Sequence, residues 1–120
     1  MAVTNTNLLS GAFLLVDTVA ANAAVAVKAS AATLYEIEID NTANAAVSFL
    51  KIFNVAGGSV VVGTTAPDWI ISCPLSVSRP IVMPAGIAFV TALSYFCVTA
   101  GGTAGATSPS SSVIVRMVYV

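Results

Sequence analysis

Three carboxylates, Glu36, Glu38 and Asp40, have the spacing best suited to chemistry in this 120-residue chain. They alternate with apolar residues, and because successive strand residues face opposite sides of a sheet, all three fall on one face. Their oxygens are ligands that calcium accepts, but calcium sites usually take carbonyl ligands from loops as well. Neighbouring carboxylates on an exposed strand also gain no burial to raise one pKa for acid–base work. The pattern therefore favours a solvated or partner-facing sheet face over a metal or catalytic site.

The chain is poor in groups that act as a general base. It has no histidine, the commonest base and metal ligand near neutral pH. A serine nucleophile would need another base, and Lys28 and Lys51 lie in strand-like segments with no accompanying motif. The glycine pairs at 57–58 and 101–102 lack the lysine and helix of a phosphate loop, which indicates turns. We expect no enzymatic activity and no cofactor, and a small hydrolase is the least favoured alternative.

The two cysteines, Cys73 and Cys97, lie on separate apolar segments. Two thiols without histidine cannot complete the usual four-ligand zinc site. Free cysteines are commonly buried in cores, whereas an assembly released into an oxidising exterior could use a disulfide between strands. Buried thiols and a disulfide both remain open.

Charge is sparse along the whole sequence. Only 8% of residues are charged against 58% hydrophobic, and the net charge is −1. The four basic residues, Lys28, Lys51, Arg79 and Arg116, are scattered singly. Nucleic-acid binding requires clustered basic residues that displace counterions, so we expect no nucleic-acid partner. With so few charges, the free monomer has little electrostatic protection against self-association, which suggests that partners cover much of the surface.

The segment Ile81–Val98 is the one stretch long and apolar enough to raise the question of a membrane helix. It contains Pro84, Gly86, Thr91 and Ser94, and no basic residue follows its C-terminal end closely. The flanking segments have the pattern of strands. We expect no membrane partner.

The length of 120 residues predicts a single domain. Residues 1–22 show no clean period and include the polar run TNTN, so we expect an N-terminal arm, with a short strand at 12–16 at most. No lysine or arginine precedes the first apolar stretch, so the basic region of a secretory signal is missing. Residues 23–120 form the expected folded domain.

That domain has the pattern of an all-β protein. Short strands are expected at 24–30, 33–40, 46–54, 59–62, 69–75, 76–84, 87–100 (one strand, or two with a bend near 92–94) and 113–120. In the second of these, Tyr35, Ile37 and Ile39 share the apolar face. Each proline marks a strand start, a sheet edge or a loop, and the segments NTAN (41–44) and PAG (84–86) mark turns. Residues 101–112 are a flexible loop. We predict an antiparallel β-sandwich, jelly-roll or Ig-like, of about seven to nine strands.

The order of several motifs from Leu34 to Val120 resembles a group of small virion structural proteins of tailed bacteriophages. The segments are LYEIEIDNTANAAVSFLKIFN, VGTTAPD, MPAGIAFVTALSYFCVT, GTAGATSPSS and the terminal VIVRMVYV. Within that group, the role most compatible with this chain is a capsid decoration, or cement, protein. The resemblance implies a β-sandwich on the virion's capsid surface, assembled in the host cytoplasm. Its partners would be the major capsid protein and itself, as a homodimer or homotrimer.

The expected contacts with the shell lie on the arm and on loop edges. Those on the arm are Asn5, Asn7, Leu8 and Leu9, and those on the loop edges are Asp68, Trp69 and Arg79. The alternative is a tail, baseplate or fibre component that acts as an adaptor or receptor-binding module. For carbohydrate binding, Trp69 and Tyr95 are the candidate aromatic residues.

Overall fold

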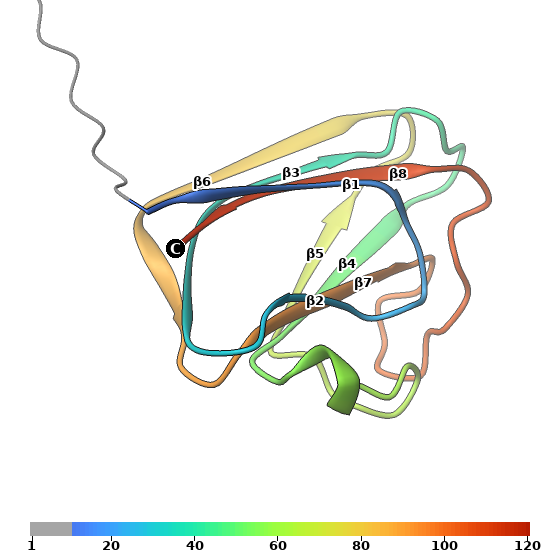
Figure 1. Ribbon diagram of the computed structural model, residues 1–120. Helices are drawn as coiled ribbons and strands as arrows, with labels where there is room; N and C mark the ends of the chain where they lie inside the picture. Colours follow the sequence, from blue (N-terminus) through green and yellow to red (C-terminus); the bar gives the residue numbers. More distant parts are fainter. Residues whose placement is uncertain (1–10) are drawn as a thin grey trace, which may run out of the picture.

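The structure is a computed structural model, and it describes residues 11–120 as a two-layered β-sandwich (Figure 1). The strands are β1 (Phe13–Ala20), β2 (Val25–Lys28), β3 (Ala32–Asp40), β4 (Ser48–Phe53), β5 (Trp69–Cys73), β6 (Ser78–Phe89), β7 (Leu93–Val98) and β8 (Val113–Tyr119). One 3-10 turn, η1 (Gly57–Ser59), follows β4. The prediction of an antiparallel sandwich of seven to nine strands is confirmed.

Each layer is a four-stranded antiparallel sheet, and the strand order is that of a jelly roll. One sheet has the order β1-β8-β3-β6 and the other β2-β7-β4-β5. We call them the 1-8-3-6 sheet and the 2-7-4-5 sheet. The pairs β4–β5, β3–β6, β2–β7 and β1–β8 are nested antiparallel pairs, like one long hairpin rolled up around the β4–β5 connection.

The core between the sheets follows from the alternation of side chains along the strands. On β4, Leu50 and Ile52 point inward and are fully buried. On β3, Leu34 and Ile37 are fully buried although they are three residues apart, because a bulge between Leu34 and Glu36 interrupts the alternation. Tyr35 is therefore only half-buried, and its predicted place on the apolar face with Ile37 is wrong.

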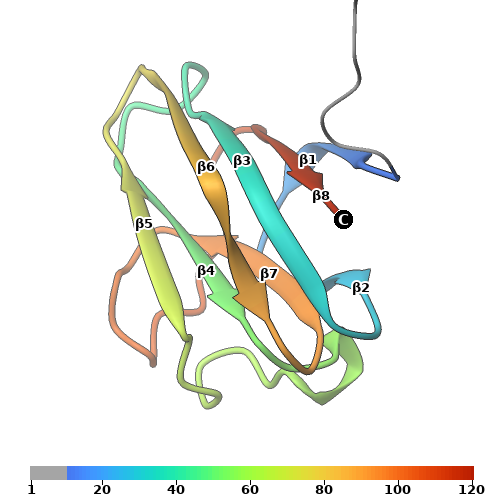
Figure 2. The ribbon, with the colours of Figure 1, turned by 90° about the vertical axis from the view of Figure 1, so that its left-hand side faces the viewer.

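Strand β6 contains Pro80, which lies inside the strand expected at 76–84, and Pro84, where that strand was expected to end. It forms the edge of the 1-8-3-6 sheet (Figure 2), where proline's missing N–H costs no ladder hydrogen bond. The predicted turn at 84–86 is instead the bulged part of this strand, and Gly86 adopts a φ of 73° there. A side chain at Gly86 would collide with Thr33, so the bulge requires glycine on steric grounds as well.

Two further expectations are corrected. Residues 13–20 of the predicted arm form β1, which pairs with β8 from Phe13↔Tyr119 to Ala20↔Val113, so the sandwich begins before residue 23. The strand expected at 59–62 is the turn η1 followed by irregular chain. Its valines, Val60 and Val62, instead pack against a second apolar cluster formed by Phe53, Phe96 and Val98.

That second cluster lies on the outer side of the 2-7-4-5 sheet, where the chain's own loops cover the central strands β4 and β7. Lys51 also points to this side and is fully buried. Its Nζ donates to the carbonyls of Gly102 and Gly105 and lies 5.6 Å from the centre of the Phe96 ring. Desolvation lowers the pKa of Lys51. The glycine-rich loop that the sequence indicates is flexible is thus tied to β4.

Both cysteines are buried free thiols in the main core. Burial raises the pKa of Cys97 from 9.0 to about 12. The neighbouring inward-facing residue on β7, Tyr95, is also fully buried, and its hydroxyl donates to Asp17 Oδ2 at 2.7 Å. This hydrogen bond joins the two sheets along one side of the sandwich. Within residues 11–120, no helix has the length and apolarity that crossing a membrane requires.

Candidate functional site

The outer face of the 1-8-3-6 sheet is the first candidate surface. Directly opposed residues of paired strands point to the same side, so the register defines rows of side chains across this face. The rows are Leu14, Val118, Glu36 and Val82; then Val16, Arg116, Glu38 and Pro80; and finally Ile114, Asp40 and Ser78. We call these residues the open face.

The open face combines exposed apolar side chains with a central acidic strand. Leu14 is 64% exposed, Val16 50% and Val82 63%. Isolated exposed apolar residues are normal on protein surfaces, but here they flank one continuous sheet face. The charged face predicted for residues 33–40 is confirmed, and β1, β8 and β6 add apolar side chains around it.

The carboxylates of this face are already engaged within the chain. Glu38 Oε1 accepts a hydrogen bond from Arg116 Nη1 at 2.9 Å, an ion pair whose side chains are about one-third exposed. Asp40 Oδ1 accepts from the side chain and the N–H of Thr42, and these hydrogen bonds lower the pKa of Asp40. In residues 11–120, no group of three His, Cys, Asp or Glu side chains is placed to hold a metal ion.

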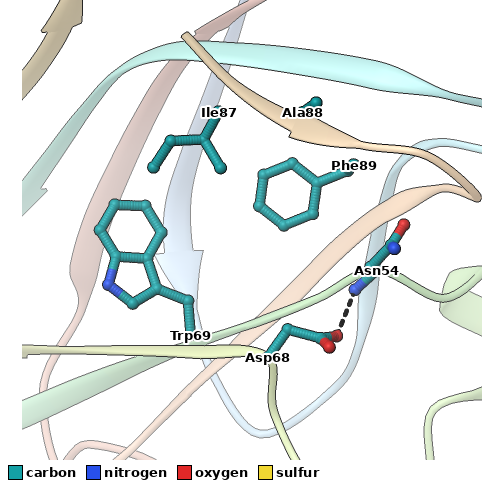
Figure 3. A pocket seen from close by; sticks show the side chains of 6 residues that line it. All are labelled: Asn54, Asp68, Trp69, Ile87, Ala88 and Phe89. Carbon is teal, nitrogen blue, oxygen red and sulfur yellow. Dashed lines mark hydrogen bonds between the residues drawn. The ribbon is translucent and has the colours of Figure 1, made fainter.

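The second candidate is a pocket of about 360 Å³ between the sheets, on the side where β5 and β6 form the two edges. Its lining residues are Asn54, Asp68, Trp69, Ile87, Ala88 and Phe89 (Figure 3). Trp69 comes from the first position of β5, and Ile87 and Phe89 come from the end of β6. The indole and these two side chains therefore face each other across the gap between the layers.

The polar lining residues hold the rim of this pocket in place. Asp68 Oδ2 accepts the N–H of Asn54 at 2.6 Å, and the N–H of Asp68 donates to the Ile52 carbonyl. Asn54 Oδ1 accepts the N–H groups of Thr91 and Ala92, which fixes the turn between β6 and β7. Asp68 is the sole titratable group among the six lining residues, so the pocket contains no base and nucleophile pair. Its chemistry suits the binding of an apolar side chain or a ring.

Of the three contact residues predicted on loop edges, the structure places Asp68 and Trp69 together and Arg79 apart from them. Asp68 and Trp69 share the pocket. Arg79 lies near the other end of β6, where its Nη1 donates to the Ser72 carbonyl of β5 and bridges the edges of the two sheets. Asn5, Asn7, Leu8 and Leu9 lie outside the residues that the structure describes.

Tyr95, a candidate for carbohydrate stacking, is fully buried in the core and has no accessible ring face. The apolar residues of the open face, above all Leu14, Val16 and Val82, were missed by the sequence analysis. Leu14 and Val16 fell in the predicted arm, and Val82 lay between two prolines. The strong alternation of residues 33–40 could have helped to find them. Strands that pair with this segment must place side chains on the same outer face as its carboxylates.

Comparisons of the chain with protein-family models, curated proteins and solved structures found no match.

Proposed function

We propose that this protein is a non-enzymatic virion structural protein that binds the outside of an assembled capsid lattice and stabilises it. The observation that carries the proposal is the asymmetry of the sandwich. On the outer side of the 2-7-4-5 sheet the chain's own loops cover the central strands β4 and β7, while the open face presents exposed Leu14, Val16 and Val82. The motif order from Leu34 to Val120 supports a place among phage capsid decoration proteins.

Stabilisation by such a protein needs no reaction. A protein that binds only the assembled lattice shifts the equilibrium toward assembly in proportion to its occupancy. The open face supplies apolar contact area with a charged centre, and an interface of ordinary stability buries roughly 1,600 Å² in total. Many copies on one shell would act together, each with the major capsid protein beneath it.

Copy number in purified particles tests the proposal. Quantitative mass spectrometry should give a ratio to the major shell protein near one or a simple fraction such as one third. A handful of copies would assign the protein to the tail or baseplate instead, and its absence from particles would overturn a virion role.

A matched pair of variants tests which face binds. Val82 on the open face and Val61 on the loop side are similarly exposed, 63% and 58%. We expect Val82→Lys to lower occupancy on shells at least tenfold, or about 1.4 kcal/mol, while Val61→Lys leaves it unchanged. Equal occupancy of both variants would reject the open face as the contact surface.

The pocket between β5 and β6 favours the second candidate, a receptor-binding or adaptor module of a tail or fibre. Trp69 offers a partly buried aromatic face beside Asn54 and Asp68, a combination suited to a sugar ring. Glycan-array binding that is lost in Trp69→Ala would support this role.

A further inference from the structure

The sandwich has four edge strands, and three of them carry features that block pairing with another chain. The edges are β1 and β6 of one sheet and β2 and β5 of the other. An exposed edge presents unpaired N–H and C=O groups, and proteins protect such edges with proline, bulges, short strands or charged residues.

Strand β6 contains Pro80 and Pro84 and a bulge of its own. Strand β5 has five residues and ends before Pro74. The carbonyl of Ser72 already accepts a hydrogen bond from the Arg79 guanidinium. Strand β2 has four residues, ends in Lys28 and is bulged against β7. All three edges are poor templates for a further strand.

Strand β1 has none of these protections over most of its length. It is eight residues long, without proline or lysine, and pairs with β8 in unbroken register from Phe13 to Asp17. Among residues 11–120, β8 is the one strand paired with it, so its other edge has no partner there. Exposed Phe13, Leu14 and Val16 line this stretch. A long, apolar, unprotected edge is a site for strand addition.

We propose that β1 pairs antiparallel with β1 of a second copy of this chain, which joins the two 1-8-3-6 sheets into one eight-stranded sheet. Antiparallel pairing of identical strands has two-fold symmetry, the commonest symmetry of homodimers. Registers that keep the faces continuous place residues of the same face opposite each other, for example Leu14 opposite Val16 of the other copy.

Charge supports a second copy as the occupant. Asp17 is the only charged residue of β1, and its carboxylate accepts hydrogen bonds from Tyr95 and from the N–H of Val19 within its own chain. Two β1 strands therefore meet without opposed like charges. Their apolar outer residues, Leu14 and Val16, would form one cluster across the dimer axis.

Sedimentation velocity of the purified full-length chain tests this pairing, with a control that the sheet itself provides. Leu14 and Val82 lie in the same row of the open face, on the two opposite edges, and are 64% and 63% exposed. We expect a dimer for the wild type and for Val82→Lys. We expect Leu14→Lys/Val16→Lys to weaken association at least about tenfold, because it places like charges opposite each other.

Charge reversal gives the decisive arm of the experiment. An equimolar mixture of Leu14→Lys/Val16→Lys with Leu14→Glu/Val16→Glu should restore a dimer, whereas each double variant alone sediments as a monomer with an unchanged circular dichroism spectrum. A monomeric wild type would overturn the proposal, and so would an oligomer that survives in both double variants. A monomer that loses particle binding through Leu14→Lys would assign β1 to the lattice partner. Failure of this pairing can be told apart from failure of the proposed capsid role, because sedimentation of the purified chain requires no particle.

Discussion

The central strands of the two sheets, β7 and β8, differ in how completely the chain covers them. All six residues of β7, Leu93–Val98, are buried. In β8 Val113, Val115 and Met117 on the inner side are buried, but Ile114, Arg116 and Val118 on the outer side are half-exposed. Both strands have strands on either side, so sheet position does not explain the difference. The difference arises outside the sheets, because loops cover the outer side of β7 and no loop covers the outer side of β8 among residues 11–120.

The comparison teaches that this chain closes one face by itself and leaves the other for partners. The loops that cover β7 contribute Val55, Val60 and Val62 on one side and carbonyl groups for Lys51 on the other. No comparable cover lies over the open face among residues 11–120, where Leu14 and Val82 stay exposed. Changes on the two faces should therefore have different effects on stability and on binding.

The largest expected effect concerns the inner side of β7, where Cys97 faces the core between the sheets, and it appears at alkaline pH. Burial raises the pKa of Cys97 from 9.0 to about 12. Below pH 9 both the folded and unfolded chains keep the proton, and above it only the unfolded chain releases it. The free energy of unfolding should therefore fall by about 1.4 kcal/mol per pH unit from this group between pH 9 and 12.

Comparison with Cys97→Ala isolates this contribution, since the other titrating groups are the same in both proteins. At pH 7 the variant should be less stable by about 1–2 kcal/mol because of the space left by sulfur. Its disadvantage should shrink above pH 9 and reverse before pH 12 in urea denaturation. A constant difference over this range would mean that water reaches the thiol in the folded protein.

Much of the sandwich could be predicted from the sequence, because polar and apolar residues alternate where one side of a strand is wet. Strand β3 shows this alternation, and the positions of β3 and β4 were both predicted within about two residues. Strand β1 was predicted only as a short strand at 12–16 of the arm, because Leu14 and Val16 remain apolar on its exposed side and its partner, β8, is about a hundred residues away. Strand β6 was divided because its prolines are tolerated only through its edge position.

The candidate site was predictable only in part. Asp68 and Trp69 stood out as a charged and an aromatic residue at a loop–strand junction, and they do share a pocket. That Ile87 and Phe89 complete the pocket depends on how the two sheets stack. Lys51 looked like an ordinary strand lysine, because its carbonyl partners lie some fifty residues further along the chain.

Lys51 gives the second prediction, on the covered face. Lys51→Ala removes the buried stem packed at Phe96 and leaves the Gly102 and Gly105 carbonyls without their donor. We expect a loss of about 3 kcal/mol in the free energy of unfolding. Lys51→Met keeps the apolar stem and should lose roughly half as much.

Hydrogen exchange shows whether the loss arises from the covering loop. The N–H of Thr99 donates to Thr107 and that of Gly105 to Gly102, so both report on this loop. Both amides should exchange faster in Lys51→Ala, while amides of β3 change only by the global loss of stability. Unchanged loop exchange would show that Lys51 does not hold the cover in place.

The smallest effect is expected on the open face, at the Glu38–Arg116 ion pair. The pair is well formed at 2.9 Å, but its side chains are 36% and 38% exposed, so water and salt screen it. Glu38→Gln should change the free energy of unfolding by about 0.5 kcal/mol or less, and 1 M salt should remove most of that difference. The pair lies in the row between Val16 and Pro80, in the middle of the proposed contact surface. Glu38→Lys, which repels Arg116, should therefore lower shell occupancy far more than it lowers stability.

The two quantities to compare are the free energy of unfolding and the occupancy on shells, each expressed as a free-energy change. If Glu38→Lys lowered both by the same amount, the open face would contribute to folding only, as the covered face does. The bare outer side of β8 would then not indicate a binding surface.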